Sequence, residues 1–140
     1  MFKKVLIPVD VSVPEGATDL LRTAKAMTAQ WDSDLHVVTV IPSVGMPIVG
    51  SYFDANFEAE NKKAAAAQLA TVVDASGISA ALHILSGTVY DKIIELAGTL
   101  GADLIVIGAN QPALRDYLLG SNAARVVRHS KQSVLVVRGD

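Results

Sequence analysis

Five short apolar runs alternate along the chain with four segments whose apolar residues recur at helical spacing. The runs cover residues 5–9, 35–41, 80–85, 104–107 and 134–137. Runs of this length that are rich in Val, Ile and Leu are typical of strands buried on both faces. Strands that alternate with helices predict a parallel sheet with right-handed crossovers and helices on both faces. The sequence therefore predicts a doubly wound α/β sheet of five strands with four helices.

The four predicted helices carry apolar residues three or four positions apart, the spacing that gives a helix one buried face. They are marked by Ala17, Leu20, Leu21 and Ala24, by residues 57–73 with Gly77 beyond them, by Thr88 to Gly101, and by residues 122–129. Residues 42–56 lack regular spacing although they include Met46, Ile48 and Tyr52. We expect a long loop there that either folds over a ligand or packs against a partner subunit.

Composition and charge exclude several classes of protein. Apolar residues make up 51% of the 140 residues and charged residues 19%, which favours one domain over residues 1–140 with a sizeable core. The formal net charge of -2 leaves no broad basic surface, so we expect no nucleic-acid partner. The apolar segment between Lys4 and Asp10 is too short for a secretory signal or a membrane span, which predicts a cytoplasmic protein that binds no membrane.

Several motifs with known chemistry are absent from the sequence. Neither G-x-G-x-x-G after the first strand nor G-x-x-x-x-G-K-[ST] occurs, which excludes the dinucleotide fingerprint and the P-loop. His36, His83 and His129 lie on two predicted strands and a helix, with no carboxylate at metal-ligand spacing. Core or surface positions are therefore favoured over metal binding for these three histidines.

Polar residues and glycines follow most of the predicted strands. Asp10 follows the first strand, residues 42–43 the second, residues 86–87 the third and residues 108–112 the fourth. Ligands of doubly wound sheets bind beyond the carboxyl ends of the strands, where the strand order reverses. We therefore expect the binding site of this chain at that edge.

The start of the last helix and the end of the first strand carry the most informative residues. Gly120, Ser121 and Asn122 offer free backbone N–H groups and the positive end of a helix dipole to an anion, although they would equally form an ordinary N-cap. Asp10 is placed either to accept hydrogen bonds from ribose hydroxyls or to cap the turn that follows it. These alternatives are open on the spacing alone.

Longer stretches of the chain resemble the universal stress protein family. They are residues 4–10 (KVLIPVD), 35–43 (LHVVTVIPS), 101–108 (GADLIVIG) and 118–129 (LLGSNAARVVRH). The resemblance covers essentially the whole chain, and residues 133–138 are similar to the F- and G-type branch. It implies a Rossmann-like fold of the adenine nucleotide alpha hydrolase kind with strand order 3-2-1-4-5.

The resemblance also implies a homodimer through the last strand and, in many members, bound ATP. The dimer strand corresponds to Val134, Leu135, Val136 and Val137, and further pairing into tetramers is left open. ATP-binding members carry the pattern G-x2-G-x9-G-[ST], which Gly108, Gly120 and Ser121 match. Gln111 stands where the pattern has its second glycine, and the interval to Gly120 is one residue shorter.

Position by position, the resemblance implies a complete nucleotide site for ATP with Mg²⁺. Pro8, Val9 and Asp10 flank adenine and ribose, the backbone of Val40 meets the adenine edge, Gly108 and Asn110 lie by the ribose and phosphates, and Gly120, Ser121 and Asn122 donate to the phosphates. Catalytic residues are not implied, because Arg115 and Asp116, the charged residues of the loop, match no motif position.

Three functions are consistent with the sequence. The first is a dimeric stress-response regulator that binds ATP. The second is an interaction or scaffold dimer of the same family without nucleotide, which Gln111 and the shortened loop favour. The third is a slow Mg²⁺-dependent ATPase.

Overall fold

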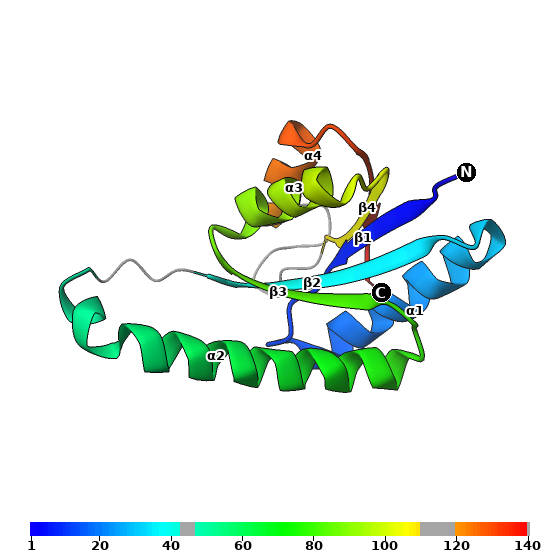
Figure 1. The fold of residues 1–140 in the computed structure, drawn as a ribbon. Helices are drawn as coiled ribbons and strands as arrows, with labels where there is room; N and C mark the ends of the chain where they lie inside the picture. The colour runs from blue at the N-terminus through cyan, green and yellow to red at the C-terminus, as the bar shows by residue number, and fades with distance from the viewer. Residues whose placement is uncertain (43–46, 110–119, 140) are drawn as a thin grey trace.

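The computed structural model describes residues 1–42, 47–109 and 120–139, with side chains described at 1–42, 57–109 and 120–139. Along this part of the chain the elements are β1 (Lys4–Pro8), α1 (Pro14–Thr28), the short 3-10 helix η1 (Ala29–Trp31), β2 (Asp34–Pro42), α2 (Pro47–Ser76), β3 (Ala81–Gly87), α3 (Val89–Leu100), β4 (Leu104–Gly108), α4 (Ser121–His129) and β5 (Ser133–Val137). The alternation of strands and helices predicted from the sequence is confirmed (Figure 1).

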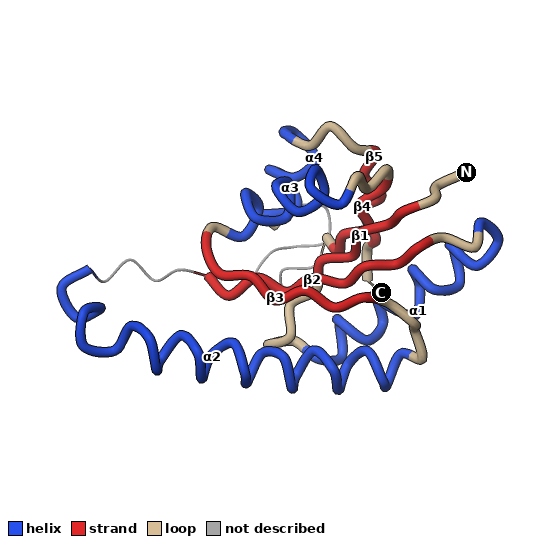
Figure 2. Tube along the Cα trace, viewed as in Figure 1, coloured by secondary structure: helices blue, strands red, loops and turns tan. Residues whose placement is uncertain are grey.

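All five strands form one parallel sheet with the order β3-β2-β1-β4-β5. The predicted order is therefore confirmed. From β1 the chain builds β2 and β3 on one side, and it then crosses to place β4 and β5 on the other side (Figure 2). The strand order thus reverses between β1 and β4, which is where doubly wound sheets bind their ligands.

Helices cover both faces of the sheet, and two separate clusters of buried side chains fill the space (Figure 1). Val5 and Ile7 of β1 point toward α1 and α2, where they pack in one cluster with Leu21 and Leu69. Leu6 points the opposite way and joins the cluster formed with α3 and α4. Since alternate residues of a strand face opposite sides, a strand buried on both faces needs apolar residues throughout.

The starts of β1 and β4 are tied together by Asp103, which precedes β4. Its carboxylate accepts the backbone N–H groups of Lys3 at 3.0 Å and Lys4 at 3.1 Å. Its own backbone N–H donates to the carbonyl of Lys4 at 2.9 Å. These contacts fix the relative position of the two strands between which the strand order reverses.

Glycines end two of the helices, as the sequence predicts. Gly77 has φ +73 and donates to the carbonyl of Val73, and Gly101 has φ +69 at the C-cap of α3. Side chains rarely tolerate this left-handed conformation, so glycine is the natural residue at both ends.

The expected loop at residues 42–56 is wrong over much of its length, because α2 begins at Pro47. Proline suits the first turn of a helix, where its missing N–H leaves no hydrogen bond unmade. In Figure 1 the first turns of α2 extend past the sheet. With no sheet face beside them, these turns need no periodic apolar residues, and periodicity is the signal from which helices are predicted. Residues 43–46, including Met46, lie outside the described residues, as do the side chains of Ile48 and Tyr52.

Within the described residues, the helices include none with the length and apolar character needed to cross a bilayer.

Two substitutions in α2 test whether its packing face is the one described. Leu69 is completely buried and Phe57 is 59% exposed. Leu69→Ala should lower the free energy of unfolding by about 2–5 kcal/mol, because it removes buried apolar contacts and leaves a cavity. Phe57→Ala should change it by less than about 0.5 kcal/mol. Urea denaturation measures both, and equal effects would show that the helix packs through another face.

Candidate functional site

The end of β1 lies at the carboxyl edge of the sheet next to the reversal of strand order, where doubly wound sheets generally form a crevice. Pro8 and Val9 are buried, and the N–H of Val9 donates to the carbonyl of Val38 at 2.9 Å. Asp10 follows immediately and is exposed. The first three predicted site residues are therefore placed at the carboxyl edge of the sheet, with the carboxylate at the rim.

Asp10 caps its own turn, which is one of the two roles open from the sequence. Its Oδ1 accepts hydrogen bonds from the Ser12 backbone N–H at 3.0 Å and from the Ser12 hydroxyl at 2.6 Å. Its carbonyl accepts the N–H of Val13 at 3.1 Å. Within the described residues Oδ2 makes no hydrogen bond. The turn thus orients the carboxylate and leaves one oxygen available to a ligand hydroxyl.

The backbone of Val40 faces the same crevice. Val38 faces β1, because its carbonyl accepts the N–H of Val9. Backbone polar groups alternate sides along a strand, so those of Val40, two residues further on, point to the same side. The pairing of β1 with β2 ends at Pro8 and Val38, so β1 has no residue paired with Val40. An amide donor and a carbonyl acceptor are therefore presented to the space beyond β1.

Gly108 ends β4, next to β1 in the sheet and opposite Val137 of β5. Among the described residues, a Cβ added there would come near only the Leu20 side chain, at 3.7 Å, an ordinary contact. Among the described residues, therefore, neither backbone strain nor a steric clash requires glycine at position 108. The close approach of a ligand to the backbone would explain why the residue is glycine.

Helix α4 begins at the same edge, because it connects β4 to the parallel strand β5. Gly120 is its N-cap and has no side chain with which to cap the helix. The backbone N–H groups in the first turn of a helix have no partner within it. At α4 they belong to Ser121, Asn122 and Ala123. Gly120 has φ -60 and ψ 153, angles that any residue adopts, so the backbone does not require glycine here either.

Part of the predicted site lies outside the described residues. Asn110 is among these residues, as are Gln111, Arg115 and Asp116 of the same segment. The described structure brings the other predicted site residues to one edge of the sheet. They are Pro8, Val9, Asp10, Val40, Gly108, Gly120, Ser121 and Asn122.

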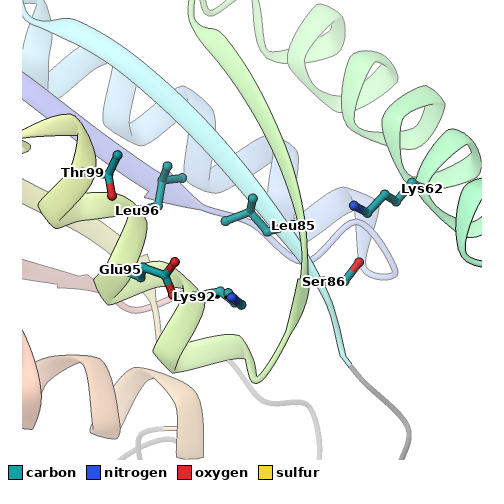
Figure 3. A pocket seen from close by; sticks show the side chains of 7 residues that line it. All are labelled: Lys62, Leu85, Ser86, Lys92, Glu95, Leu96 and Thr99. Atoms are coloured by element: carbon teal, nitrogen blue, oxygen red, sulfur yellow. Dashed lines mark hydrogen bonds and ion pairs between the residues drawn. The ribbon is translucent and has the colours of Figure 1, made fainter.

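A cavity of about 350 Å³ lies elsewhere, beside the edge strand β3 (Figure 3). Its lining comes from α2, β3 and α3 and consists of Lys62, Leu85, Ser86, Lys92, Glu95, Leu96 and Thr99. The ammonium of Lys92 lies 3.4 Å from the carboxylate of Glu95, so its charge is partly balanced. The lining includes no residue of the predicted nucleotide site. We therefore locate that site from the reversal of strand order and not from this cavity.

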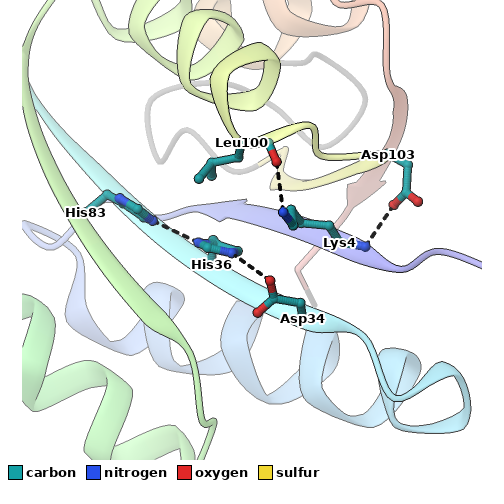
Figure 4. A network of polar contacts seen from close by, with 6 residues as sticks. All are labelled: Lys4, Asp34, His36, His83, Leu100 and Asp103. Carbon is teal, nitrogen blue, oxygen red and sulfur yellow. Dashed lines mark hydrogen bonds and ion pairs between the residues drawn. The ribbon is translucent and has the colours of Figure 1, made fainter.

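A second polar cluster was missed by the sequence analysis. The Nδ1 atom of His36 lies 2.9 Å from Nε2 of His83, and Nε2 of His36 lies 3.1 Å from Oδ2 of Asp34 (Figure 4). His36 pairs with Ala81 and His83 with Val38, so the histidines are diagonal neighbours on adjacent strands. The spacing of Asp34 and His36 places both on one face of β2, which the sequence could have shown. The contact with His83 depends on the register of β3.

The environment of His83 disfavours its charged form. Burial and the neighbouring His36 lower the pKa of His83 below its usual 6.5.

Across residues 1–42, 57–109 and 120–139, groups of three or more His, Cys, Asp or Glu arranged to hold a metal ion are absent.

A doubly wound parallel sheet with a helix that begins, without a side-chain cap, at its carboxyl edge defines a Rossmann-like α/β protein. Within that class the chain belongs to the universal stress protein family, whose model matches residues 1–138.

Known proteins of the family match nearly the whole chain. Universal stress protein G of Shigella flexneri is 38% identical over 99% of this chain and 100% of its own length. The protein of that name from Salmonella typhimurium is 36% identical over the same shares. Among solved structures, universal stress protein UspA from Lactobacillus plantarum has a TM-score of 0.70 at 24% identity, covering 97% of both chains. A universal stress protein in complex with cAMP has a TM-score of 0.67 at 24% identity, covering 97% of this chain and 96% of its own. At this identity the structural matches support the fold alone.

The free energy of unfolding should decrease as the pH falls below 6.5. Unfolded His83 takes up a proton around its ordinary pKa of 6.5, whereas the folded protein takes it up only at lower pH. Between those values the unfolded state binds more protons, so stability falls with falling pH, and above them the contribution vanishes. His83→Gln should flatten this part of the profile. Urea denaturation between about pH 8 and about pH 5 measures it, and an unchanged profile in the variant would contradict the assignment.

Proposed function

We propose that this protein is a cytoplasmic, dimeric regulator of the stress response that binds ATP where its strand order reverses. The observation that carries the proposal is the start of α4, which has no side-chain cap and lies at the carboxyl edge of the sheet. Its first-turn N–H groups and the helix dipole favour a phosphate. Family membership supports the stress-response role.

The surrounding residues fit the remaining parts of an adenine nucleotide. The backbone donor and acceptor of Val40 suit the edge of an adenine ring, which presents one acceptor and one donor side by side. The second carboxylate oxygen of Asp10 suits the ribose hydroxyls. Gly108 allows the ligand to approach the backbone. The cAMP complex of a protein with the same fold is consistent with an adenine nucleotide as the ligand of this chain.

Mg²⁺ is proposed to accompany ATP, held mainly by phosphate oxygens and water, as this ion prefers oxygen ligands and keeps several waters. The exposed carboxylate of Asp10 lies at the rim of the proposed site and could provide a further oxygen to Mg²⁺. The chain's own contribution is to bind and orient the nucleotide. We do not assign a catalytic base, because the charged loop residues Arg115 and Asp116 lie outside the described residues.

A matched pair of substitutions at Ser121 tests the phosphate position. Ser121 is exposed in the first turn of α4. Ser121→Glu should stabilise the helix by about 0.3–1 kcal/mol through its dipole, yet weaken ATP binding about tenfold or more by repelling the phosphates. Ser121→Gln has nearly the same shape without the charge and should bind ATP within about threefold of the wild type. Calorimetric titration with ATP gives the affinities, and thermal unfolding gives the stabilities.

Two outcomes would contradict the proposal. Equal ATP affinity of Ser121→Glu and Ser121→Gln would show that the phosphates bind elsewhere. A wild-type protein that binds no ATP would favour the scaffold dimer that lacks nucleotide.

The dimer is proposed to form through β5, which pairs with β4 alone in the described sheet. Leu135 and Val137 pack toward one core cluster, whereas Val134 and Val136 pack toward the other. All four remain partly exposed. An edge strand that is apolar on both faces, with unpaired backbone groups, favours pairing with a second chain.

Substitution of Val136 by proline tests this interface. The carbonyl of Val137 accepts the N–H of Ala109, so the backbone of Val137 faces β4 and that of Val136 faces outward. Val136→Pro therefore removes an outward N–H without removing a hydrogen bond to β4, and it should shift the dimer to monomer. Val136→Thr keeps both the N–H and the branched shape and should remain dimeric. Light scattering measures the mass, and a folded Val136→Pro dimer would place the interface elsewhere.

A further inference from the structure

The pair formed by His36 and His83 lies outside the proposed nucleotide site. Leu6 pairs with His36, and the nucleotide edge begins beyond the pair of Pro8 with Val38. The His36 side chain is 12% exposed and its partner Asp34 is 61% exposed. The cluster is therefore partly buried, with Asp34 as its exposed end. Figure 4 shows His83, His36 and Asp34 in a row across β3 and β2.

Asp34 determines which nitrogen of His36 carries the proton. An ionised carboxylate only accepts hydrogen bonds, so Nε2 of His36 must be protonated to donate to Oδ2 of Asp34. A neutral His36 then has a lone pair on Nδ1, which faces Nε2 of His83 at 2.9 Å. A gap of this length has room for one proton, so one proton is shared between two imidazole nitrogens.

The separation of the two nitrogens matches a metal chelate. Imidazole nitrogens bind transition metals at about 2.0–2.1 Å, so two of them at a right angle around the ion lie about 2.9 Å apart. Tetrahedral coordination would separate them by about 3.3–3.4 Å instead. The observed 2.9 Å is the length of a hydrogen bond, and adjacent positions of a square-planar or tetragonal ion, the geometry of Cu(II) and Ni(II), require the same separation. The two rings therefore need to tilt toward a common ion but need not move apart.

The surroundings of the pair favour a cation. In a metal-binding histidine, the ring nitrogen that does not bind the metal usually donates its N–H to a carboxylate or carbonyl. Asp34 accepts such a hydrogen bond from Nε2 of His36. The opposing charge is the ammonium of Lys4, which donates to the carbonyl of Leu100 at 3.0 Å.

We propose that His36 and His83 chelate a divalent ion of the Cu(II) or Ni(II) class, with Asp34 as the positioning residue. Water completes the coordination, since the described residues supply no third protein ligand. The ion lies to the side of the line between the two nitrogens, and the proton on Nε2 of His83 moves to Nδ1 of the same ring, so that each of the facing nitrogens offers a lone pair to the ion. Bound metal joins β2 to the edge strand β3 and stabilises the folded state.

The test is a titration of the nucleotide-free, metal-stripped protein with Cu²⁺, followed by calorimetry and electron paramagnetic resonance. The wild type should bind one equivalent and show coupling to two nitrogens. His36→Asn and His83→Gln place an amide near the lost nitrogen, which preserves a hydrogen bond, and each should weaken binding about tenfold or more. Asp34→Asn should keep the two-nitrogen signal with about tenfold lower affinity.

His129→Asn is the matched control, because it removes the third histidine of the chain, on α4, and leaves the pair intact. It should bind Cu²⁺ as the wild type does. Cu²⁺ should also raise the Tm of the wild type and of His129→Asn but not that of His83→Gln. The proposal is overturned if the pair variants bind Cu²⁺ as tightly as the wild type, which would mean adventitious binding, or if the wild type shows no saturable site.

Discussion

The structure depends most on the burial and pairing of β1. This strand is the centre of the sheet, with β2 on one side and β4 on the other, and its residues Val5, Leu6 and Ile7 are completely inaccessible to solvent. Because it contributes to both core clusters, β1 connects the two helical layers. The Asp103 carboxylate then fixes the start of β4 against the start of β1. The crevice at their far ends follows from these contacts.

The proposed nucleotide site uses backbone groups that the fold leaves unpaired at one edge. β1 ends before β2, so the polar groups of Val40 extend past their last paired neighbour on β1. Helix α4 begins without a capping side chain at Gly120. Both groups lie at the carboxyl edge because every strand of a parallel sheet ends there. A ligand with an adenine edge and a phosphate can satisfy both sets, which explains why so few specialised side chains are needed.

Much of the fold could be predicted from the sequence because its strands are apolar and its helices are amphipathic. The runs at residues 5–9 and 104–107 could hardly be exposed, and Gly77 and Gly101 marked real helix ends. The start of α2 could not be predicted, since its first turns extend past the sheet and carry no periodic apolar face. Prediction from periodicity therefore succeeded only where a helix packs against the sheet.

The candidate site likewise contains residues that the sequence identifies and contacts that it does not. Asp10 and Gly120 could be found because they directly follow a strand and directly precede a helix, positions that the order of elements places at one edge. Whether Asp10 caps its turn or meets a ligand could not be decided, and the structure shows that the first role uses only one of its oxygens. The contact of His36 with His83 could not be predicted from the sequence, because the two residues are 47 positions apart and only the register of β2 and β3 brings them together.

The two proposed sites share β2 but use different parts of it. Val40 would serve a nucleotide through its backbone near the end of β2, whereas His36 uses its side chain four residues earlier, on the face covered by α3. Beyond the histidines, β3 continues to Gly87, whose φ of +141 turns the chain toward α3. A Cβ there would come within 2.8 Å of the Lys92 side chain and would stand on a positive φ, so glycine suits this turn. Because β3 leads directly into this turn, a metal that joins β3 to β2 would restrain the strand that precedes α3, whereas the proposed nucleotide site lies at the ends of β1 and β4.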